Sequence, residues 1–256
     1  MRVGAGRVSL YHAVLDCSPG RDGQVTCQHA EDCLGQPGER AILIPGAAGG
    51  LEAVLSVPQS ALEGTAFPTI VAVICHPHPL MGGTMQNKVV FTLHRACRDL
   101  GMATIRFNFR GVGASAGAYG EGVGEQEDLL AVLAWLDTLP QRPALVLAGF
   151  SFGSWVTASV LARVQAAGWA LRTALLVAPP VTRFPLDGLV LPPVTRAIYG
   201  DADEVVDPVA MADWLRRALP VEAVTCLAGA GHFFHARLGE LKDWATRCIQ
   251  NSGVRE

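Results

Sequence analysis

The stretch PALVLAGFSFGSWVTASV, residues 143–160, decides the fold. Residues 144–150 form a continuous apolar run of the length of a buried strand, and residues 154–167 have the pattern of a helix. The motif G-x-S-x-G joins the two and places Ser151 on the turn between them. Such a turn presents the serine oxygen above the end of a sheet, and its glycines leave room for neighbouring elements. We therefore predict that Ser151 is a nucleophile.

The same motif occurs a second time, at residues 113–117, with Ser115 at its centre. Residues 111–124 are rich in glycine, and no helix pattern follows Ser115 directly, so this stretch predicts a flexible loop after a strand. Residues 111–116 also come near to a dinucleotide-binding fingerprint, but that fingerprint needs an immediate helix. The context therefore favours Ser151 over Ser115.

Strand and helix patterns alternate along the rest of the chain. The expected strands are residues 69–75, 103–109, 174–178, 194–199 and 221–227, and the expected helices are residues 87–100, 124–139, 208–218 and 234–249. Residues 41–44 and 51–57 are typical of a hairpin at the edge of a sheet. This alternation predicts an α/β fold, in which helices cover both faces of a mostly parallel sheet.

The domain organisation follows from the same pattern. Residues 39–256 contain no internal repeat and no linker, which indicates one domain. Residues 1–38 show no sustained periodicity and are rich in Gly, Ser, Asp and Gln. We expect them to form an irregular, loosely held N-terminal extension.

Composition and charge limit the classes of function. Half of the 256 residues are hydrophobic and 17% are charged, which suffices for a sizeable core and is unlike a disordered chain. The net charge of −3 and the scattered Lys and Arg predict no nucleic-acid partner. The longest apolar runs are strand-sized, and residues 1–15 lack a clean apolar signal region. We expect a cytoplasmic protein with no membrane partner.

The seven cysteines fit that compartment as free thiols. Four of them lie in strand or helix patterns as small buried hydrophobes: Cys75, Cys97, Cys226 and Cys248. The other three, Cys17, Cys27 and Cys33, with His29 between them, suggest a metal site as an alternative. Their spacing matches no zinc pattern, so we expect no metal there.

A serine hydroxyl is too weakly acidic to attack unaided and needs a general base, usually histidine. Downstream of Ser151 the chain has two histidines, His232 and His235. His232 ends a loop of small residues, 228–232, that follows an apolar strand, whereas His235 is expected inside the next helix. We predict that His232 is the base.

The acid that orients this base is expected between the serine and the histidine in the chain. Acidic residues gather in residues 200–207, just beyond a predicted strand end, where functional loops of parallel sheets lie. Asp207 precedes a proline, as helix N-caps do, and Asp201 is suited to fixing the turn. We predict that Asp203 is the orienting acid.

A tetrahedral intermediate also needs two backbone N–H donors. One is expected from Phe152, which comes directly after the nucleophile, and the other from the loop at residues 76–79. The two prolines of that loop have no N–H, so we predict His78 as the second donor. His76 and His78 are an alternative metal pair, but nearby carboxylates and a third ligand are lacking. We expect neither a metal nor a cofactor.

Several motifs together resemble those of a known family. They are HPHP at residues 76–79, GGTM and NKV within 82–89, FNFRGVG at 107–113, the turn at 149–153, GDAD at 200–203 and GHFF at 231–234. Over residues 39–250 the chain resembles small bacterial α/β-hydrolases related to dienelactone hydrolases. The resemblance implies an eight-stranded sheet, a Ser-His-Asp triad and esterase-type hydrolysis. Dienelactone hydrolases use a cysteine where this chain has Ser151, so their particular substrate is not carried over.

Lipases and many other hydrolases of this fold insert a lid between two of the later strands. Here a short Pro-rich span joins residues 177–180 to the strand at 194–199, which leaves no room for a helical cap. An open, shallow site favours small or exposed acyl groups. The expected apolar walls are Leu80, Met81, Phe152, Phe184 and Phe233.

The sequence leaves three functions open. The first is a serine carboxylesterase that acts on small-molecule esters, with thioesters as an extension. The second is a serine peptidase or amidase, although amide cleavage demands protonation of a poor leaving group and usually a domain that positions the peptide. The third is a non-catalytic interaction module, which has no need of Ser151, Asp203 and His232 together.

Overall fold

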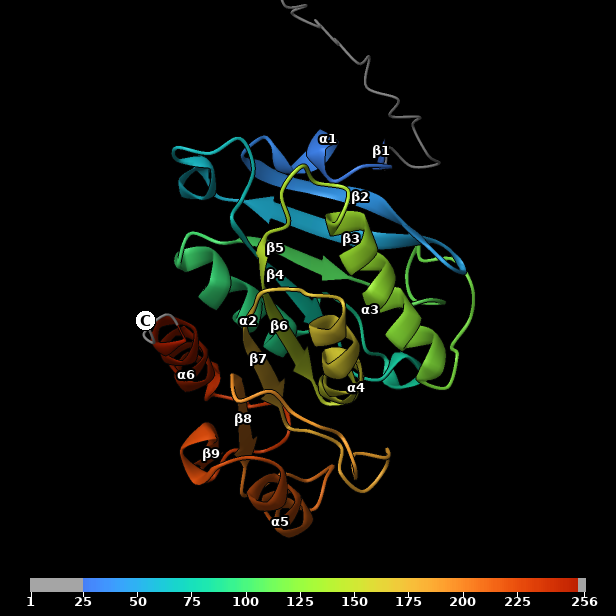
Figure 1. Ribbon diagram of the computed structural model, residues 1–256. Helices are drawn as coiled ribbons and strands as arrows, with labels where there is room; N and C mark the ends of the chain where they lie inside the picture. The colour runs from blue at the N-terminus through green and yellow to red at the C-terminus, as the bar shows by residue number, and fades with distance from the viewer. Residues whose placement is uncertain (1–24, 253–256) are drawn as a thin grey trace, which may run out of the picture.

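The computed structural model describes residues 25–252, and a central sheet runs through the whole of this part (Figure 1). The strands are β1 (Val25–Thr26), β2 (Gly38–Gly46), β3 (Gly49–Val57), β4 (Ile70–Cys75), β5 (Ala103–Phe107), β6 (Ala144–Phe150), β7 (Leu171–Val177), β8 (Thr195–Gly200) and β9 (Val224–Leu227). Their order is β1-β2-β3-β5-β4-β6-β7-β8-β9. β3 is antiparallel to both of its neighbours, and every other pair is parallel. The mostly parallel sheet of eight strands is confirmed in β2 to β9, and β1 adds a strand of two residues at the edge.

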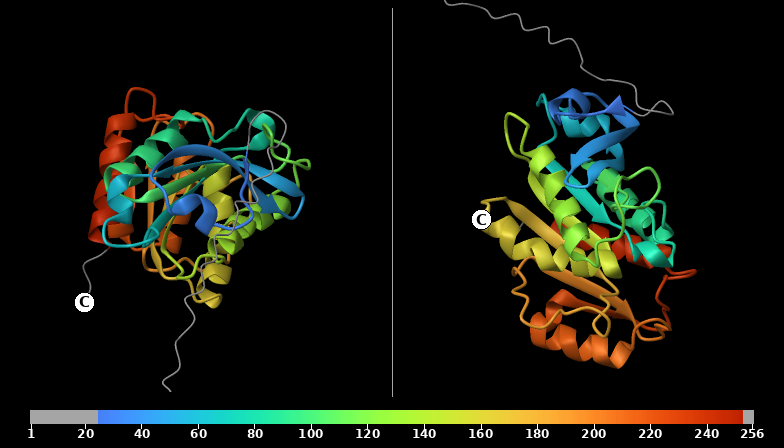
Figure 2. Two further views of the ribbon diagram at one scale, coloured as in Figure 1. Left: turned by 90° about the horizontal axis from the view of Figure 1, so that it is seen from above. Right: turned by 90° about the vertical axis from the view of Figure 1, so that its right-hand side faces the viewer.

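The helices are α1 (Glu31–Leu34), α2 (Lys88–Asp99), α3 (Val123–Leu136), α4 (Phe152–Ala166), α5 (Pro208–Ala218) and α6 (Leu238–Asn251). α3 and α4 pack together on one face of the sheet, and α2 and α6 pack together on the other (Figures 1 and 2). The predicted covering of both faces is therefore confirmed.

Alternate side chains of the central strands supply the two halves of the core. On β4, Val71 and Val73 belong to the cluster that contains the α3 and α4 side chains, whereas Ala72 and Ile74 belong to the cluster under α2 and α6. All four are fully buried. A strand buried on both faces reads as an uninterrupted apolar run, which is the pattern that predicted β4 and β6.

Residues 25–37 differ from the irregular, loosely held segment expected from the sequence. β1 pairs with β2, and the side chains of Ala30 and Leu34 are fully buried in the core. The N–H of Ala30 donates to Thr138 Oγ1 at 2.9 Å, just beyond the end of α3. The first 24 residues of the expected extension lie outside the described part of the chain. The boundary at residue 38 stays a prediction.

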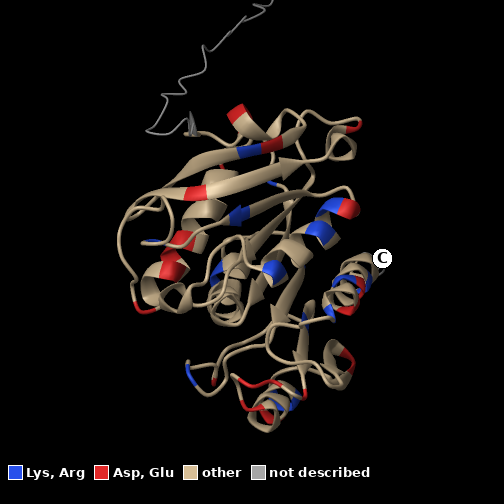
Figure 3. Ribbon diagram, turned by 180° about the vertical axis from the view of Figure 1, so that it is seen from behind, with Lys and Arg blue, Asp and Glu red and all other residues tan. Residues whose placement is uncertain are grey.

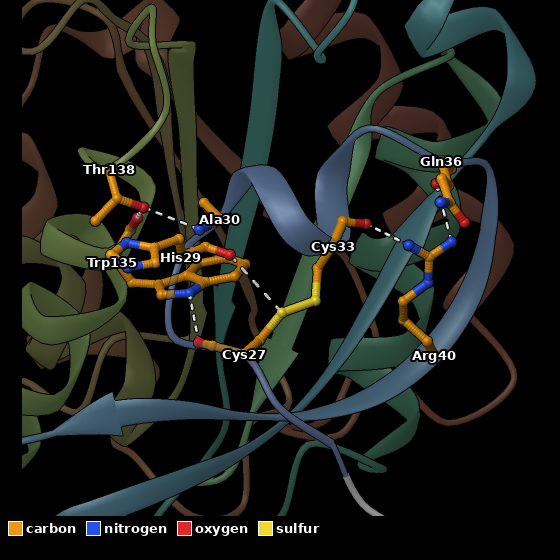
Figure 4. The surroundings of a disulfide bond; sticks show 8 residues. All are labelled: Cys27, His29, Ala30, Cys33, Gln36, Arg40, Trp135 and Thr138. Carbon is orange, nitrogen blue, oxygen red and sulfur yellow. Dashed lines mark hydrogen bonds between the residues drawn. A yellow bond between two sulfur atoms is a disulfide. The ribbon is translucent and has the colours of Figure 1, made fainter. Parts of the chain in front are cut away.

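A disulfide joins Cys27 and Cys33 (Figure 4), so the expectation of free thiols is wrong at these positions. α1 reverses the chain and brings the two Cα atoms within 6.8 Å, and Trp135 Nε1 donates to the Cys27 C=O at 2.9 Å. Cys17 lies outside the described residues, and the remaining cysteines are free. A disulfide is typical of proteins from oxidising compartments, so it weighs against the cytoplasmic location, which stays a prediction.

The last helix begins later than expected, at Leu238 instead of residue 234. Phe234 and Ala236 have positive φ angles of 51° and 58°, which a helix does not accommodate. Phe234 is also fully buried against the sheet. His235 therefore lies in a turn before α6, where the Lys88 Nζ is 2.6 Å from its Nδ1, and the prediction that it is helical is wrong.

Charged residues of both signs are interspersed over the helices and strands (Figure 3). Within residues 25–252, no helix combines the length and the apolar character that a membrane span requires.

Candidate active site

The turn at Ser151 has the predicted context. β6 ends at Phe150 and α4 begins at Phe152, so Ser151 is the single residue between them. Its φ of 53° and ψ of −119° lie in a region that residues other than glycine rarely adopt. The Ser151 N–H donates to the C=O of Val177 on β7 at 2.8 Å, which fixes this strained residue against the sheet.

The two glycines of the turn are required by close backbone packing. A Cβ on Gly149 would lie 2.1 Å from the C=O oxygen of Gly153, and a Cβ on Gly153 would lie 2.4 Å from the C=O oxygen of Cys75. Both distances are far below a van der Waals contact. The start of α4 therefore approaches the ends of β4 and β6 more closely than any side chain permits.

Ser151, His232 and Asp203 form a continuous chain of hydrogen bonds. The Ser151 Oγ lies 3.0 Å from the His232 Nε2, and the His232 Nδ1 lies 2.7 Å from an Asp203 carboxylate oxygen. Because the carboxylate only accepts, the neutral ring carries its proton on Nδ1 and Nε2 is free to accept from the serine. Phe150 and Phe233 pack against the imidazole, with centroids 5.1 Å from it. The structure thus brings together the three residues predicted from the sequence.

Asp203 is held in place by the backbone that comes after it. Its Oδ1 accepts the N–H groups of Val205 and Val206, both at 2.8 Å, and its Oδ2 faces His232. The side chain is fully buried. These two N–H bonds fix the orientation of the carboxylate, so that its other oxygen faces the imidazole.

The two neighbouring aspartates have the structural roles expected of them. Asp207 is the N-cap of α5 and accepts the N–H of Val209 at 2.9 Å. Asp201 Oδ1 accepts the N–H of Gly229 at 2.5 Å and so joins the loop after β8 to the loop after β9. Neither carboxylate contacts the His232 ring.

The two predicted N–H donors belong to residues that line the same cavity as Ser151. Phe152 is the first residue of α4, so its N–H has no acceptor within the helix and lies at the positive end of the helix dipole. His78 lies on the loop after β4, outside any strand. Among residues 25–252, neither N–H has a hydrogen-bond acceptor. Both donors are therefore available to a ligand.

The side chain of His78 holds its own loop in shape. Its Nδ1 accepts the N–H of Leu80 at 3.2 Å, and its Nε2 lies 3.2 Å from the hydroxyl of Tyr119. The ring packs against Phe152 with centroids 4.9 Å apart. Burial lowers the pKa of His78, which favours the neutral ring that these contacts require. The imidazole thus links the two elements that carry the predicted donors.

His76 has a structural role in place of the alternative role as a metal ligand. Its Nδ1–H donates to the C=O of Pro77 at 2.6 Å, and its Nε2 accepts the N–H of Phe109 at 3.0 Å. Burial lowers its pKa to about 4, so it is neutral at pH 7. With both ring nitrogens occupied it has no lone pair to offer to a metal. In the described part of the chain, no group of three or more His, Cys, Asp or Glu has the arrangement of a metal site.

A cavity of about 350 Å³ lies beside Ser151 and His232. Most of the predicted wall residues line it, and four further apolar residues join them. Its apolar side chains come from Pro77, Met81, Phe152, Pro180, Phe184, Val205, Val206 and Phe233. The prediction that Leu80 is a wall residue is wrong, because Leu80 does not line the cavity. Leu80 lies in a short turn of 3₁₀ helix, Pro79–Met81, from which only Met81 reaches the cavity.

Two residues near the site were not found by sequence reasoning. Arg183 is the charged residue among those that line the cavity, and its Nη2 makes a long contact of 3.4 Å with the C=O of Val205. Glu204 accepts the backbone N–H of His232 through its Oε2 at 3.0 Å. The only signal for Glu204 was its place next to Asp203, and the segment that carries Arg183 has no motif.

The hydroxyl of Ser115, at the centre of the second G-x-S-x-G motif, bonds to two backbone groups and not to a histidine. Its Oγ donates to the C=O of Asn108 at 2.6 Å and accepts the N–H of Glu52 at 2.9 Å. The hydroxyl therefore joins the loop after β5 to strand β3. As the sequence predicted, Ser115 lies in a loop with no helix directly behind it, because α3 begins at Val123.

The chain matches no protein-family model, but it is similar in sequence and in fold to known proteins. An uncharacterised protein of Rickettsia prowazekii is 32% identical over 198 residues, which is 72% of this chain and 82% of that protein. A serine hydrolase without a lid from Xanthomonas campestris is similar in structure, with 35% identity, a TM-score of 0.74, and coverage of 85% of this chain and 96% of the other. A serine hydrolase homologue from Coxiella burnetii has 39% identity, a TM-score of 0.70, and coverage of 81% and 96%.

Proposed function

The chain belongs to the α/β-hydrolase superfamily, and from this premise we propose that it is a serine esterase that hydrolyses carboxylic esters of small or exposed acyl groups. The observation that carries the proposal is the hydrogen-bonded chain of Ser151, His232 and Asp203 at the edge of an apolar cavity. Thioesters of the same acyl groups fit the same chemistry.

The first half of the reaction forms an acyl-enzyme on Ser151. His232 Nε2 takes the proton from the serine as Oγ attacks the carbonyl carbon, and the resulting imidazolium is stabilised by Asp203. The N–H groups of His78 and Phe152 donate to the oxyanion of the tetrahedral intermediate. The imidazolium then gives its proton to the leaving alcohol, and the C–O bond breaks.

The second half repeats these steps with water. His232 takes a proton from a water molecule that attacks the acyl carbon, the same two N–H groups stabilise the oxyanion, and the proton returns to Ser151 as the acid is released. Every proton moves at the His232 Nε2. The protein groups therefore suffice for the whole cycle.

The shape of the site supports small acyl groups. Residues 178–194, which join β7 to β8, contain no helix, so this connection forms no helical lid over the cavity. A cavity of about 350 Å³ with apolar walls accommodates a short acyl chain or a compact ring. The peptidase alternative has no such support, because residues 25–252 show no second domain or clamp that positions a peptide.

The test is hydrolysis of p-nitrophenyl butyrate by the purified protein, compared with an amino-acid p-nitroanilide and with the Ser151→Ala variant. We expect ester turnover that disappears in the variant, and little or no anilide cleavage. Labelling of Ser151 by a fluorophosphonate probe is the second measurement. Faster cleavage of the anilide than of the ester would favour the peptidase alternative, and the absence of both turnover and labelling would favour a non-catalytic module.

A further inference from the structure

Two consecutive carboxylates hold His232 at two different points. Asp203 contacts the imidazole Nδ1, and Glu204 Oε2 accepts the backbone N–H of the same histidine at 3.0 Å. Asp203 and Glu204 lie on the loop after β8, whereas His232 lies on the loop after β9. The hydrogen-bond chain explains Asp203. Nothing in the proposed reaction so far explains Glu204.

The chain before His232 leaves room for this carboxylate. A Cβ on Gly231 would lie 2.5 Å from the Glu204 Oε2, so a side chain at this position would displace the carboxylate. The two loops also lie close together at Gly200, the last residue of β8. A Cβ on Gly200 would lie only 1.9 Å from the C=O oxygen of Ala230. The absence of a side chain at Gly231 is therefore part of the contact between Glu204 and His232.

The backbone of His232 needs such an anchor. Residues 228–237 contain no strand or helix, and two residues just after His232, Phe234 and Ala236, have positive φ angles. The imidazole must keep its Nε2 near 3.0 Å from the Ser151 Oγ while it takes and returns a proton. A displacement of about 1 Å of a catalytic group lowers turnover by about 100-fold. A charge-assisted hydrogen bond to the histidine N–H limits that displacement.

We propose that Glu204 is a positioning residue, which fixes the backbone of His232 so that its Nε2 stays within hydrogen-bond distance of the Ser151 Oγ. The proposal rests on the proposed serine hydrolase chemistry. Glu204 does not line the cavity, so it acts through His232 and not through the substrate. It should therefore change kcat and leave KM nearly unaltered.

The chain offers a matched control at Asp201. Its Oδ1 accepts the N–H of Gly229, three residues before His232, at 2.5 Å. Asp201 therefore joins the same two loops as Glu204 and by the same kind of bond. Asp201→Ala removes a carboxylate and one connection between the loops. It leaves the contacts of His232 with Asp203 and Glu204 in place. A loss of activity in this variant would therefore come from a general loosening of the loops and not from a displaced histidine.

The experiment measures kcat and KM for p-nitrophenyl butyrate in Glu204→Ala, Glu204→Gln and Asp201→Ala. We expect Glu204→Ala to lower kcat by about 10-fold to 100-fold with KM within about twofold of wild type. Glu204→Gln keeps an oxygen that accepts the N–H and should stay within about threefold of wild type. Asp201→Ala should keep kcat within about twofold, even where its melting temperature falls. Equal kcat values for Glu204→Ala and Asp201→Ala, or a Gln variant as impaired as the Ala variant, would overturn the proposal.

The rate of fluorophosphonate labelling gives a measurement that does not depend on the ester. We expect Glu204→Ala to label more slowly than wild type by a factor similar to its loss in kcat. A wild type that labels but hydrolyses no ester would contradict the esterase function and leave the labelling rates to decide the role of Glu204. Labelling of Glu204→Ala at the wild-type rate would contradict the positioning role alone. A wild type that neither labels nor hydrolyses would contradict both.

Discussion

Ser115 and Ser151 occupy the same place in two copies of G-x-S-x-G, but their hydroxyl groups have different partners. The Ser115 Oγ donates to one backbone group at 2.6 Å and accepts from another at 2.9 Å. The fold therefore uses this hydroxyl both as a donor and as an acceptor. The Ser151 Oγ faces a histidine at 3.0 Å and lines a cavity. One serine is part of the scaffold, and the other is open to a ligand.

The glycines do not separate the two motifs, because both copies need them for steric reasons. Gly113 has a positive φ of 57°, which side chains disfavour, and a Cβ on Gly149 would lie 2.1 Å from a backbone oxygen. The motif therefore marks a crowded turn and not a nucleophile. The two copies differ in the element directly after the serine. A helix that begins at the next residue provides a free N–H and a strained serine, and only Ser151 has this helix.

The largest expected effect is on ester turnover after removal of each hydroxyl. Ser151→Ala should lower kcat/KM by at least about 1,000-fold, because no nucleophile remains. Ser115→Ala should stay within a few-fold of wild type, because Ser115 lies away from the cavity. The measurement is p-nitrophenyl butyrate hydrolysis by both variants at equal concentrations of folded protein. Comparable losses in the two variants would break the comparison.

The next effect concerns Asp203, the acid that contacts the histidine beside Ser151. Asp203→Asn should lower turnover by about 100-fold to 10,000-fold, because an amide cannot hold the imidazole in the correct tautomer or compensate its positive charge. Asp201→Asn and Asp207→Asn serve as controls, since their carboxylates fix a loop and a helix start. These two should change stability by about 1 kcal/mol and turnover only slightly. A larger kinetic loss at Asp201 than at Asp203 would move the acid to Asp201.

The three residues of this hydrogen-bonded chain were predictable because each one comes after a strand that the sequence marks clearly. Ser151, Asp203 and His232 lie just beyond β6, β8 and β9, and parallel strands end at the same edge of a sheet. The order of the elements therefore brings the residues together before any side-chain detail is known. The covering of both faces was predictable for a related reason, because uninterrupted apolar runs of strand length alternate with longer helical stretches along the chain.

The features that could not be predicted depend on local backbone geometry. Leu80 and Met81 are adjacent and equally apolar, and only their orientation in one turn decides which of them lines the cavity. The helical pattern around His235 gave no sign of the left-handed residues beside it. The disulfide between Cys27 and Cys33 requires the reversal of the chain at α1, which has only four residues and no periodic signal.

A smaller effect is expected on stability, and here the order of the two variants is reversed: Ser115→Ala should be the more damaging change. Ser115→Ala should lower the free energy of unfolding by about 1–3 kcal/mol, because the N–H of Glu52 and the C=O of Asn108 lose a buried partner. Ser151→Ala should change it by about 0.5 kcal/mol or less, since its Oγ has one partner and the backbone strain remains. Urea unfolding of the two variants provides the comparison. Greater destabilisation by Ser151→Ala would show that the Ser151 hydroxyl also stabilises the fold.

The smallest effect concerns the cavity, which Ser151 lines and Ser115 does not. The cavity has a volume of about 350 Å³, and residues 178–194 form no helical lid over it, so we expect an acyl chain that extends beyond the cavity to remain in water. Each methylene inside the cavity should contribute about 0.8 kcal/mol at most, and each one outside should contribute nothing. We expect kcat/KM for p-nitrophenyl esters to peak between acetate and hexanoate and to fall for laurate and longer chains. The series should be measured below and above the micellar concentration of each substrate, and no jump in rate should occur at the interface. A preference for long chains, or a jump at the interface, would mean that a segment such as residues 179–193 closes over the cavity as a lid.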